Sequence, residues 1–268
     1  MHLGLVFYYL IAFFVNIITF STTATIGKRP MLTHSIKQTR LVIDSNIKTI
    51  YLSFDDGPLT GTINCIDICT REKVPATFFE VGWHQSRSAF GKKIYQQILK
   101  DSALFAIANH SYSHANSKYI NFYHHPDSAL LDFLKAKYFL KPTNNITRLP
   151  GNNAWNLMTK RRASELVSPL VRKMDSLAYN VIGWDLQWRF DKKGRPIQSP
   201  KWMAMQVDSL FFYNQTVTKN HLVILMHDHM FRAPQDSIKL EQFIQLLKQN
   251  GRYTFQKLTH YPGLKPNS

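Results

Sequence analysis

The sequence predicts one α/β domain in which parallel strands and helices alternate as a closed or nearly closed β/α barrel. Continuous apolar runs rich in Val, Ile and Phe indicate strands that are buried on both faces. These runs cover residues 49–54, 76–81, 103–109, 146–150, 180–184, 222–226 and 253–258. The stretches between them favour helices, at 62–72, 88–101, 127–140, 162–178, 200–214 and 236–249. Alternation at this spacing is typical of βαβ units.

The chain begins with a nearly unbroken apolar run over residues 3–20, followed by a small polar stretch and the basic pair Lys28-Arg29. The run is at the short limit for crossing a hydrocarbon core of about 30 Å. We expect residues 1–27 to be a signal peptide or an N-terminal membrane anchor, so that the protein is exported to the periplasm, the cell envelope or the medium. A buried helix of a cytosolic protein is the alternative, but the run lacks the polar face of a surface helix.

The rest of the chain divides into three parts. Residues 28–45 are expected to form a linker, residues 46–262 the single domain, and residues 263–268 a tail. Lys and Arg number 33 against 17 Asp and Glu, a formal net charge of +16. This charge favours an anionic partner such as an envelope polymer. No nucleic-acid partner is expected, because the sequence contains no recognition helix, RNA-binding motif or zinc finger. Two cysteines exclude a disulfide scaffold.

Polar residues follow the predicted strands in chain order. The first strand is followed by Asp55 and Asp56, the third by His110 and His114, the fourth by Arg148, the fifth by Asp185 and the sixth by His227. In a β/α barrel the carboxyl ends of the strands converge on the face where active sites are built. We therefore expect these side chains to meet in one pocket.

The two histidines His110 and His114 are four residues apart, and one helical turn would place both imidazoles on the same side. Two imidazoles, one carboxylate and an open position make up a catalytic zinc site. Asp55 and Asp56 can supply the carboxylate, with the second one free to accept a proton. The alternative is that both histidines lie on the surface, since the chain contains 11 histidines. The acidic pair Asp55-Asp56 at a strand end favours the metal site over this alternative.

Five motifs carry a resemblance to a known family. SFDDGP, HSYSH, RLPG, the Trp184-Asp185 region and ILMHD occur in the order and approximate spacing of the polysaccharide deacetylases, the NodB-homology enzymes of carbohydrate esterase family 4. The resemblance covers nearly all of residues 48–258. It implies a distorted (β/α)7–8 barrel and a hydrolase that uses a divalent metal to remove acetyl groups from amino sugars or O-acetylated sugars.

The resemblance implies roles for residues on the metal side of the site. Asp56, His110 and His114 would hold the metal, Zn²⁺ first, with Co²⁺ or Mn²⁺ as alternatives. Asp55 would be the general base that takes a proton from the metal-activated water, and Arg148 would pair with Asp55 and orient it. This set suits amide hydrolysis at neutral pH, which needs a stronger nucleophile than water.

On the opposite side, the resemblance assigns His227 as the general acid that protonates the departing amine. Asp185 would partner His227 and raise its pKa. Leu225 and Trp188 would form the pocket for the acetyl methyl, and the backbone N–H of Gly151 would help to stabilise the oxyanion. Gly151 departs from the family, which usually has an aromatic residue there, and the segment around Asp185 is one residue shorter than the common pattern.

The predicted function is therefore removal of N-acetyl groups from a GlcNAc-type polysaccharide or oligosaccharide of the cell envelope. One alternative is an O-acetyl carbohydrate esterase on the same scaffold. A second alternative, from another class, is a non-catalytic glycan-binding module, which predicts a poor metal site. In each case the expected partner is an acetylated glycan. If the N-terminal segment is retained, it is also expected to attach the protein to a membrane.

Overall fold

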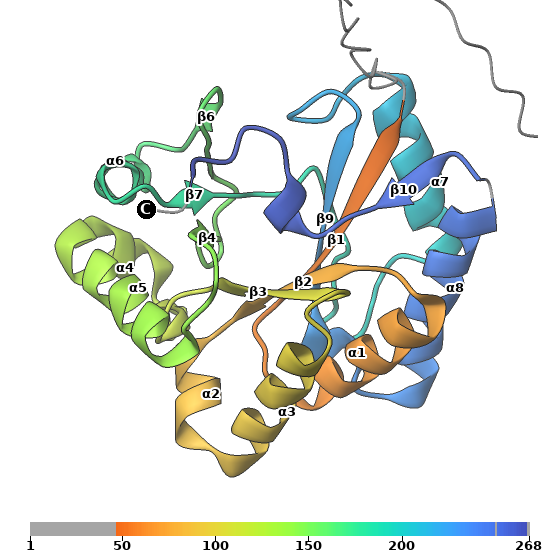
Figure 1. The fold of residues 1–268 in the computed structure, drawn as a ribbon, viewed down its shortest axis with the longest axis horizontal. Coiled ribbons are helices and arrows are strands. Elements are labelled where there is room, and N and C mark those ends of the chain that lie inside the picture. Colours follow the sequence, from red (N-terminus) through yellow and green to blue (C-terminus); the bar gives the residue numbers. More distant parts are fainter. Residues whose placement is uncertain (1–46, 250, 267–268) are drawn as a thin grey trace, which may run out of the picture. The chain divides into compact units, whose positions relative to one another are not determined.

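A curled, mixed β-sheet forms the centre of the molecule in the computed structural model, which describes residues 47–249 and 251–266 (Figure 1). The strands are β1 Lys48–Asp55, β2 Ala76–Glu80, β3 Phe105–Asn109, β4 Ile146–Thr147, β5 Trp155–Asn156, β6 Arg161–Arg162, β7 Asn180–Val181, β8 Leu186–Gln187, β9 His221–His227 and β10 Tyr253–Phe255. Their order is β6-β5-β7-β4-β3-β2-β1-β9-β8, and β10 pairs with β1. The predicted distorted barrel is confirmed. Among the described residues the sheet curls without joining β6 to β8.

Helices follow the strands as the alternation predicts. They are α1 Thr60–Glu72, α2 Gly82–Arg87, α3 Ala89–Lys100, α4 Tyr119–His124, α5 Pro126–Leu140, α6 Ser168–Ser176, α7 Pro200–Phe212 and α8 Pro234–Gln249, with short 3₁₀ turns η1 His114–Ser117, η2 Asp228–Phe231 and η3 Leu258–His260. In Figure 1, α1, α3, α7 and α8 lie along β1, β2 and β9, whereas α4, α5 and α6 lie beside β4 and β7.

Two strands after β3, β4 and β7, are shorter than predicted. β4 and β7 each contain two residues, and β5 and β6 form an antiparallel pair that the apolar pattern did not indicate. Pro150 contributes to the early end of β4, because proline has no backbone N–H for the ladder. Residues past the strand ends still align, since Ile182 N donates to Thr147 O at 2.9 Å. The carboxyl ends of these strands therefore stay on the same side of the sheet as that of β1.

Alternation along the central strands decides which side chains enter the barrel. In β1, Leu52 and Phe54 pack into the cluster beneath the helices, whereas Tyr51 belongs to the inner cluster. In β9, Ile224 packs outward and Val223 packs inward. Since side chains alternate along a strand, Asp55 and His227 lie on the inner face with Tyr51 and Val223.

The described residues all lie in one compact unit. The predicted leader (1–27) and the predicted linker (28–45) lie outside the described residues. Part of the predicted tail packs on the domain, because Gly263 O accepts from Met158 N at 2.9 Å and Lys265 N donates to Asn180 Oδ1 at 2.8 Å. No helix in residues 47–249 and 251–266 is long and apolar enough to cross a membrane.

Candidate active site

The two adjacent carboxylates at the end of β1 point in different directions. Asp55 ends the strand and is buried, whereas Asp56 has a φ of 78°, in the left-handed region. The backbone oxygen of Asp56 accepts a hydrogen bond from His84 Nδ1 at 2.8 Å, and Gly57 O accepts from Val81 N at 2.8 Å. This turn is therefore anchored to the segment that follows β2, in part through the His84 side chain.

The segment that carries His110 and His114 is a tight turn. Ser111 and His114 have φ values of 68° and 50°, so the turn is not the helical one that the spacing predicted. That expectation is wrong in its geometry, although both imidazoles still face Asp56. Left-handed residues reverse the chain within four positions and bring the second ring back to the first.

A carboxylate from α5 fixes this turn from behind. Asp132 Oδ2 accepts hydrogen bonds from Tyr112 N at 2.8 Å and Ser113 N at 3.1 Å, the two residues that precede His114. Ser111 N donates to Asn109 Oδ1 at 2.9 Å. Sequence reasoning missed Asp132, because it lies about twenty residues along the chain, in an ordinary helix.

Three ligand atoms converge at Asp56, His110 and His114. Asp56 Oδ1 lies 3.5 Å from His110 Nε2 and 3.0 Å from His114 Nε2, and one ligand atom from each residue lies within 4.8 Å of the others. Asp56 Oδ1 is buried and makes no hydrogen bond. His110 Nδ1 lies 3.0 Å from the carbonyl oxygen of Arg148. A carbonyl only accepts, so Nδ1 carries the proton and Nε2 keeps a lone pair toward Asp56.

These donors fit a divalent metal ion. Two imidazole nitrogens and one carboxylate oxygen are a ligand set typical of Zn²⁺, and His110 Nε2 directs its lone pair toward Asp56. Burial opposes ionisation of Asp56, but its contacts with His110 and His114 and the charge of His227 outweigh it and hold the pKa of Asp56 well below its usual value. The carboxylate is therefore available as an anionic ligand.

Arg148 forms a buried ion pair with Asp55. Its Nη1 donates to Asp55 Oδ1 at 2.7 Å and to Ser53 Oγ at 2.8 Å. Nε donates to Ile182 O at 3.1 Å and Nη2 to Gly183 O at 2.8 Å. The guanidinium also lies over the ring of Phe79. With one oxygen of Asp55 held in this way, the other, Oδ2, points toward His110 Nε2 at 3.6 Å.

His227 faces the same space from β9, but Asp185 does not reach it. Asp185 accepts hydrogen bonds from Val217 N and Val223 N, both at 2.7 Å, and His227 Nδ1 is buried without a hydrogen bond. Asp185 lies level with Val223, four residues before His227 and so about 13 Å away along the strand. The predicted Asp185–His227 pair is therefore wrong. Burial raises the pKa of Asp185 to about 6 and lowers the pKa of His227.

Of the two residues predicted to form the methyl pocket, Leu225 lies on the inner face of the sheet and Trp188 does not. Leu225 is buried and lies outside the cluster beneath the helices, on the inner face with Val223 and His227. Trp188 is buried in the outer cluster, with its ring centroid 5.2 Å from that of Phe243. Assignment of Trp188 to the pocket is wrong, because β8 presents its other face there. Gln187 pairs in register with Leu225 and is the residue beside it.

The departure at Gly151 has a structural counterpart in Tyr119. Gly151 has a φ of 67°, and a Cβ added to it would lie 3.3 Å from the Tyr119 ring. The same ring packs edge-on against His114, with centroids 5.7 Å apart. An aromatic ring from α4 thus lies where Gly151 leaves room, next to a candidate metal ligand.

Two more buried carboxylates lie beneath the turn at Asp56. A Cβ added to Gly57 would lie 2.5 Å from Asp228 Oδ2 and 2.7 Å from Glu80 Oε1. Neither oxygen of Glu80 makes a hydrogen bond, whereas Asp228 accepts one from Thr62. Burial and the neighbouring acids raise the pKa of Glu80 well above its usual value, and burial raises that of Asp228 to about 8. Glycine is thus required between them.

Two aromatic rings border the acid side of the site. The ring of Phe190 lies edge-on to His227 at 5.0 Å and to His229 at 4.6 Å between centroids. His229 Nδ1 lies 3.8 Å from Asp56 Oδ2. Phe190 and His229 were not among the predicted site residues. The position of His229, two residues after His227, could have indicated that it lies near the site. No pattern in the sequence indicated that Phe190 does.

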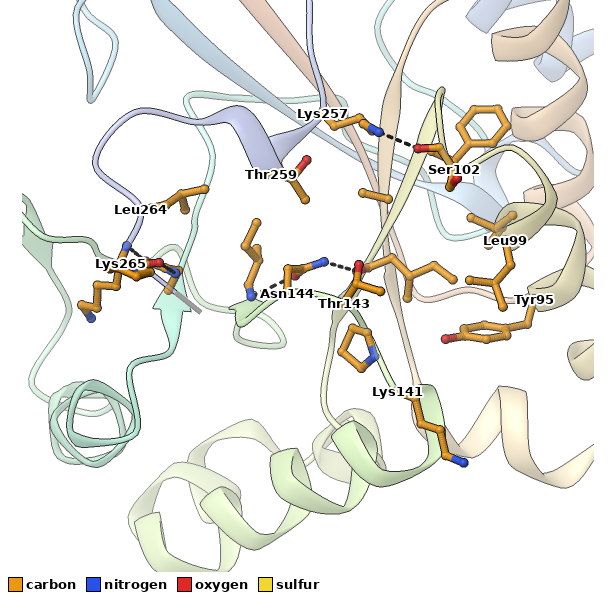
Figure 2. A pocket seen from close by; sticks show the side chains of 18 residues that line it. Tyr95, Leu99, Ser102, Lys141, Thr143, Asn144, Lys257, Thr259, Leu264 and Lys265 are labelled. Atoms are coloured by element: carbon orange, nitrogen blue, oxygen red, sulfur yellow. Dashed lines mark hydrogen bonds between the residues drawn. The ribbon is translucent and has the colours of Figure 1, made fainter. Parts of the chain in front are cut away.

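A cavity of about 560 Å³ lies away from these residues (Figure 2). Its lining includes Phe105, Ile146 and Asn180, which begin β3, β4 and β7. It is therefore at the amino ends of the strands, whereas the candidate site is at their carboxyl ends. Lys257 at its edge donates to Ser102 O at 2.6 Å. The predicted site residues do not line it.

Comparison with known proteins agrees with this geometry. A sequence model described as polysaccharide deacetylase matches residues 43–141, which include Asp55, Asp56, His110 and His114. Chitin disaccharide deacetylase of Vibrio alginolyticus is 25% identical, over 80% of this chain and 71% of that protein.

Solved structures show the same arrangement of strands and helices. The catalytic domain of a peptidoglycan N-acetylglucosamine deacetylase from Eubacterium rectale has a TM-score of 0.59 and 26% identity, over 82% of this chain and 93% of that one. An esterase of carbohydrate esterase family 4 from Streptococcus mutans has a TM-score of 0.58 and 22% identity, over 80% of this chain and 87% of that one.

Proposed function

Because the chain belongs to the polysaccharide deacetylase family, with a carbohydrate esterase family 4 domain, we propose that it hydrolyses N-acetyl groups on a GlcNAc-type glycan of the cell envelope. One observation carries the proposal. Asp55 and His227 pair in register at the ends of β1 and β9, next to the convergent atoms of Asp56, His110 and His114. A base and an acid thus border one candidate metal site.

In this proposal Asp56, His110 and His114 hold a divalent cation, with Zn²⁺ favoured by the two imidazoles and Co²⁺ or Mn²⁺ as alternatives. When bound, the cation supplies a Lewis acid that lowers the pKa of water and stabilises negative charge on the acetyl oxygen. Asp132 and the Arg148 carbonyl keep the two histidines in place.

Asp55 is the proposed general base. Arg148 fixes its Oδ1, which leaves Oδ2 facing the ligand atoms and free to accept the proton of the attacking water. The attack forms a carbon–oxygen bond at the acetyl carbonyl. The carbon–nitrogen bond then breaks, and acetate and a free amine are the products.

His227 is the proposed general acid that donates a proton to the departing nitrogen. Burial lowers its pKa, so its protonated form is a stronger acid than an ordinary imidazolium. Phe190 packs edge-on against the ring and limits its movement. Leu225 and Gln187 are proposed to border the acetyl methyl, and the Gly151 N–H is proposed to contact the acetyl oxygen.

An O-acetyl esterase is the second candidate, and one observation favours it. His227 Nδ1 has no hydrogen-bond partner, and Asp185 is bound to β9 instead. An alcohol leaves more easily than an amine and depends less on a proton donor. Hydrolysis of an ester would therefore depend less on a hydrogen-bond partner for His227. A His227→Ala variant that keeps most of its activity would support the esterase.

Location at the cell envelope is also part of the proposal. It is supported by the apolar run at residues 3–20 and by the net charge of +16, which suits an anionic surface. Localisation of the full chain in cell fractions, with and without residues 1–27, is the direct measurement.

The test of activity is acetate release by metal-stripped protein and by protein reloaded with Zn²⁺, Co²⁺ or Mn²⁺. The substrates are chitooligosaccharides, peptidoglycan, lipopolysaccharide and acetylated xylan. We expect release only after reloading, and from N-acetylated substrates above xylan. Release from xylan alone would replace the proposal with the esterase. No release together with no bound metal would favour a glycan-binding module.

A further inference from the structure

We propose that a basic hairpin beside His227, residues 189–197, binds an oxyanion group of the glycan, a carboxylate or a phosphate. The preferred substrate would then be an anionic glycan rather than a neutral one. This inference rests on the proposed function for the identity of the reacting sugar, but its binding test does not depend on turnover.

The hairpin lies against the edge of the candidate site. An antiparallel bridge between Phe190 and Pro196 closes it, and Ile197 N donates to Arg189 O at 2.9 Å. The Phe190 ring contacts His227 and His229. A Cβ added to Gly194, whose φ is 70°, would lie 3.1 Å from His229 Cδ2. Both the base and the tip of the hairpin therefore approach the residues on the acid side.

The hairpin carries four exposed cations: Arg189, Lys192, Lys193 and Arg195. Its single acid, Asp191, accepts hydrogen bonds from Lys193 N at 2.8 Å, Arg195 N at 3.0 Å and the Arg195 guanidinium at 3.0 Å. Asp191 thus shapes the turn and neutralises Arg195. Within residues 47–249 and 251–266, Arg189, Lys192 and Lys193 form no ion pair.

A fifth cation fixes the backbone under the two lysines. Arg232, just after η2, donates from Nη2 to Lys193 O at 2.6 Å and from Nη1 to His229 O at 3.1 Å. The backbone that carries Lys192 and Lys193 is therefore tied to the residues beside His227. Cations grouped on one short hairpin repel one another, and a bound oxyanion relieves that repulsion. Since the group that leaves as an amine would lie near His227, we expect an oxyanion on the same or the next sugar to approach the hairpin that contacts His227 through Phe190.

The test measures binding in the Asp55→Asn protein loaded with Zn²⁺, which should not turn over its ligands. Calorimetry compares three oligosaccharides: neutral chitotetraose, a tetrasaccharide of alternating glucuronate and GlcNAc, and a GlcNAc disaccharide that carries a phosphate. Each is measured at low and at moderate salt. The additional pair of substitutions is Lys192→Ala with Lys193→Ala. Its matched control is Lys92→Ala with Lys93→Ala, which removes the same charge from the exposed start of α3, a helix that packs on α2 and β3.

We expect an anionic ligand to bind about fivefold more tightly than chitotetraose at low salt, with the difference reduced at moderate salt, as for exposed ion pairs. The preference should disappear in K192A/K193A and persist in K92A/K93A. The ligand with the larger preference identifies the carboxylate or the phosphate as the group. Equal binding of all three ligands, or an unchanged preference in K192A/K193A, would overturn the inference.

Turnover by the unsubstituted protein separates this inference from the proposed function. A lysine-dependent binding preference without acetate release from any substrate would refute the proposed function and leave the hairpin as an oxyanion site. Acetate release from chitotetraose together with equal binding of neutral and anionic ligands would refute the hairpin alone.

Discussion

Asp55 and His227 are partners in the sheet, paired in register at the carboxyl ends of β1 and β9. Both side chains point to the inner face, so two groups 172 positions apart in the chain border one site. The backbone ladder itself fixes the spacing between the proposed base and the proposed acid. Substitution of either side chain should therefore change chemistry without moving the other.

Asp55→Asn should lower kcat/KM by about a thousandfold, the contribution typical of a general base, and leave the zinc content unchanged. Asp55 lies beside the convergent ligand atoms without being among them. Zinc analysis and acetate release on the same sample provide the measurement. Asp56→Asn is the matched control and should lose the metal. Metal loss in Asp55→Asn instead would mean that the two carboxylates have exchanged roles.

Asp132→Asn should weaken zinc affinity by about tenfold or more, as is usual when a group behind the ligands is altered. The amide has one oxygen with which to accept the two N–H groups of Tyr112 and Ser113, and it brings N–H donors of its own. Competition with a chelator measures the affinity. Asp127→Asn, on the exposed face of the same helix α5, serves as the control. Equal affinity in the two variants would remove Asp132 from the site.

Arg148→Lys should lower the free energy of unfolding by about 3 kcal/mol, because a buried ion pair loses its geometry. A lysine cannot reach Asp55, Ser53 and the carbonyls of Ile182 and Gly183 together. Urea unfolding of metal-free protein gives the change. A loss below about 0.5 kcal/mol would mean that the pair contributes no more than an exposed one.

Gly151→Ala should destabilise the protein by more than the 1–2 kcal/mol typical of a left-handed L-residue. The added Cβ also meets the Tyr119 ring at 3.3 Å. Gly251→Ala is the control, since its φ is 63° and a Cβ there meets nothing within 4 Å. In a Tyr119→Ala background, Gly151→Ala should cost no more than the control. Equal effects of Gly151→Ala with and without Tyr119 would show that the ring does not limit this position.

Asp228 should contribute a loss of stability of the metal-free protein as the pH rises from about 4 to about 8. Asp228 has a pKa of about 8 in the folded chain, and an ordinary aspartate has one near 3.9. Between these values the folded state holds a proton that the unfolded state has released, so higher pH favours unfolding. Asp228→Asn, which can still accept from Thr62, should flatten this dependence in urea unfolding. Parallel pH profiles for the two proteins would contradict the prediction.

The central half of the site follows from the sequence because long buried strands leave little freedom. β1 and β9 are continuous apolar runs, so the position of Asp55 and His227 at their ends could be predicted from the pattern. The apolar pattern gave no such guide to the short strand β8. β8 has two residues, and a shift of one residue along a strand exchanges its faces. Trp188 therefore turns outward, and Gln187 takes the inner place.

Contacts between distant segments account for the other differences. Tyr119 and Asp132 reach the site from α4 and α5, and Phe190 reaches it from a hairpin. Each is an ordinary residue in its own segment, so only the packing of the whole domain identifies it. The predicted contact between Asp185 and His227 is wrong for a related reason. Asp185 accepts hydrogen bonds from the backbone N–H groups of Val217 and Val223 instead.

The position of β8 at one end of the strand order has a consequence for local unfolding. β1 is hydrogen-bonded to β9 on one side and to β2 and β10 on the other, whereas β8 has β9 as its neighbour. Segments with fewer backbone bonds open at lower free energy than central strands. We therefore expect the end strand β8 and the hairpin that follows it to open at lower free energy than the end of β1 that carries Asp55 and Asp56. Amide hydrogen exchange should then be faster in β8 and the hairpin than in β1, so that the two sides of the site exchange as separate cooperative units.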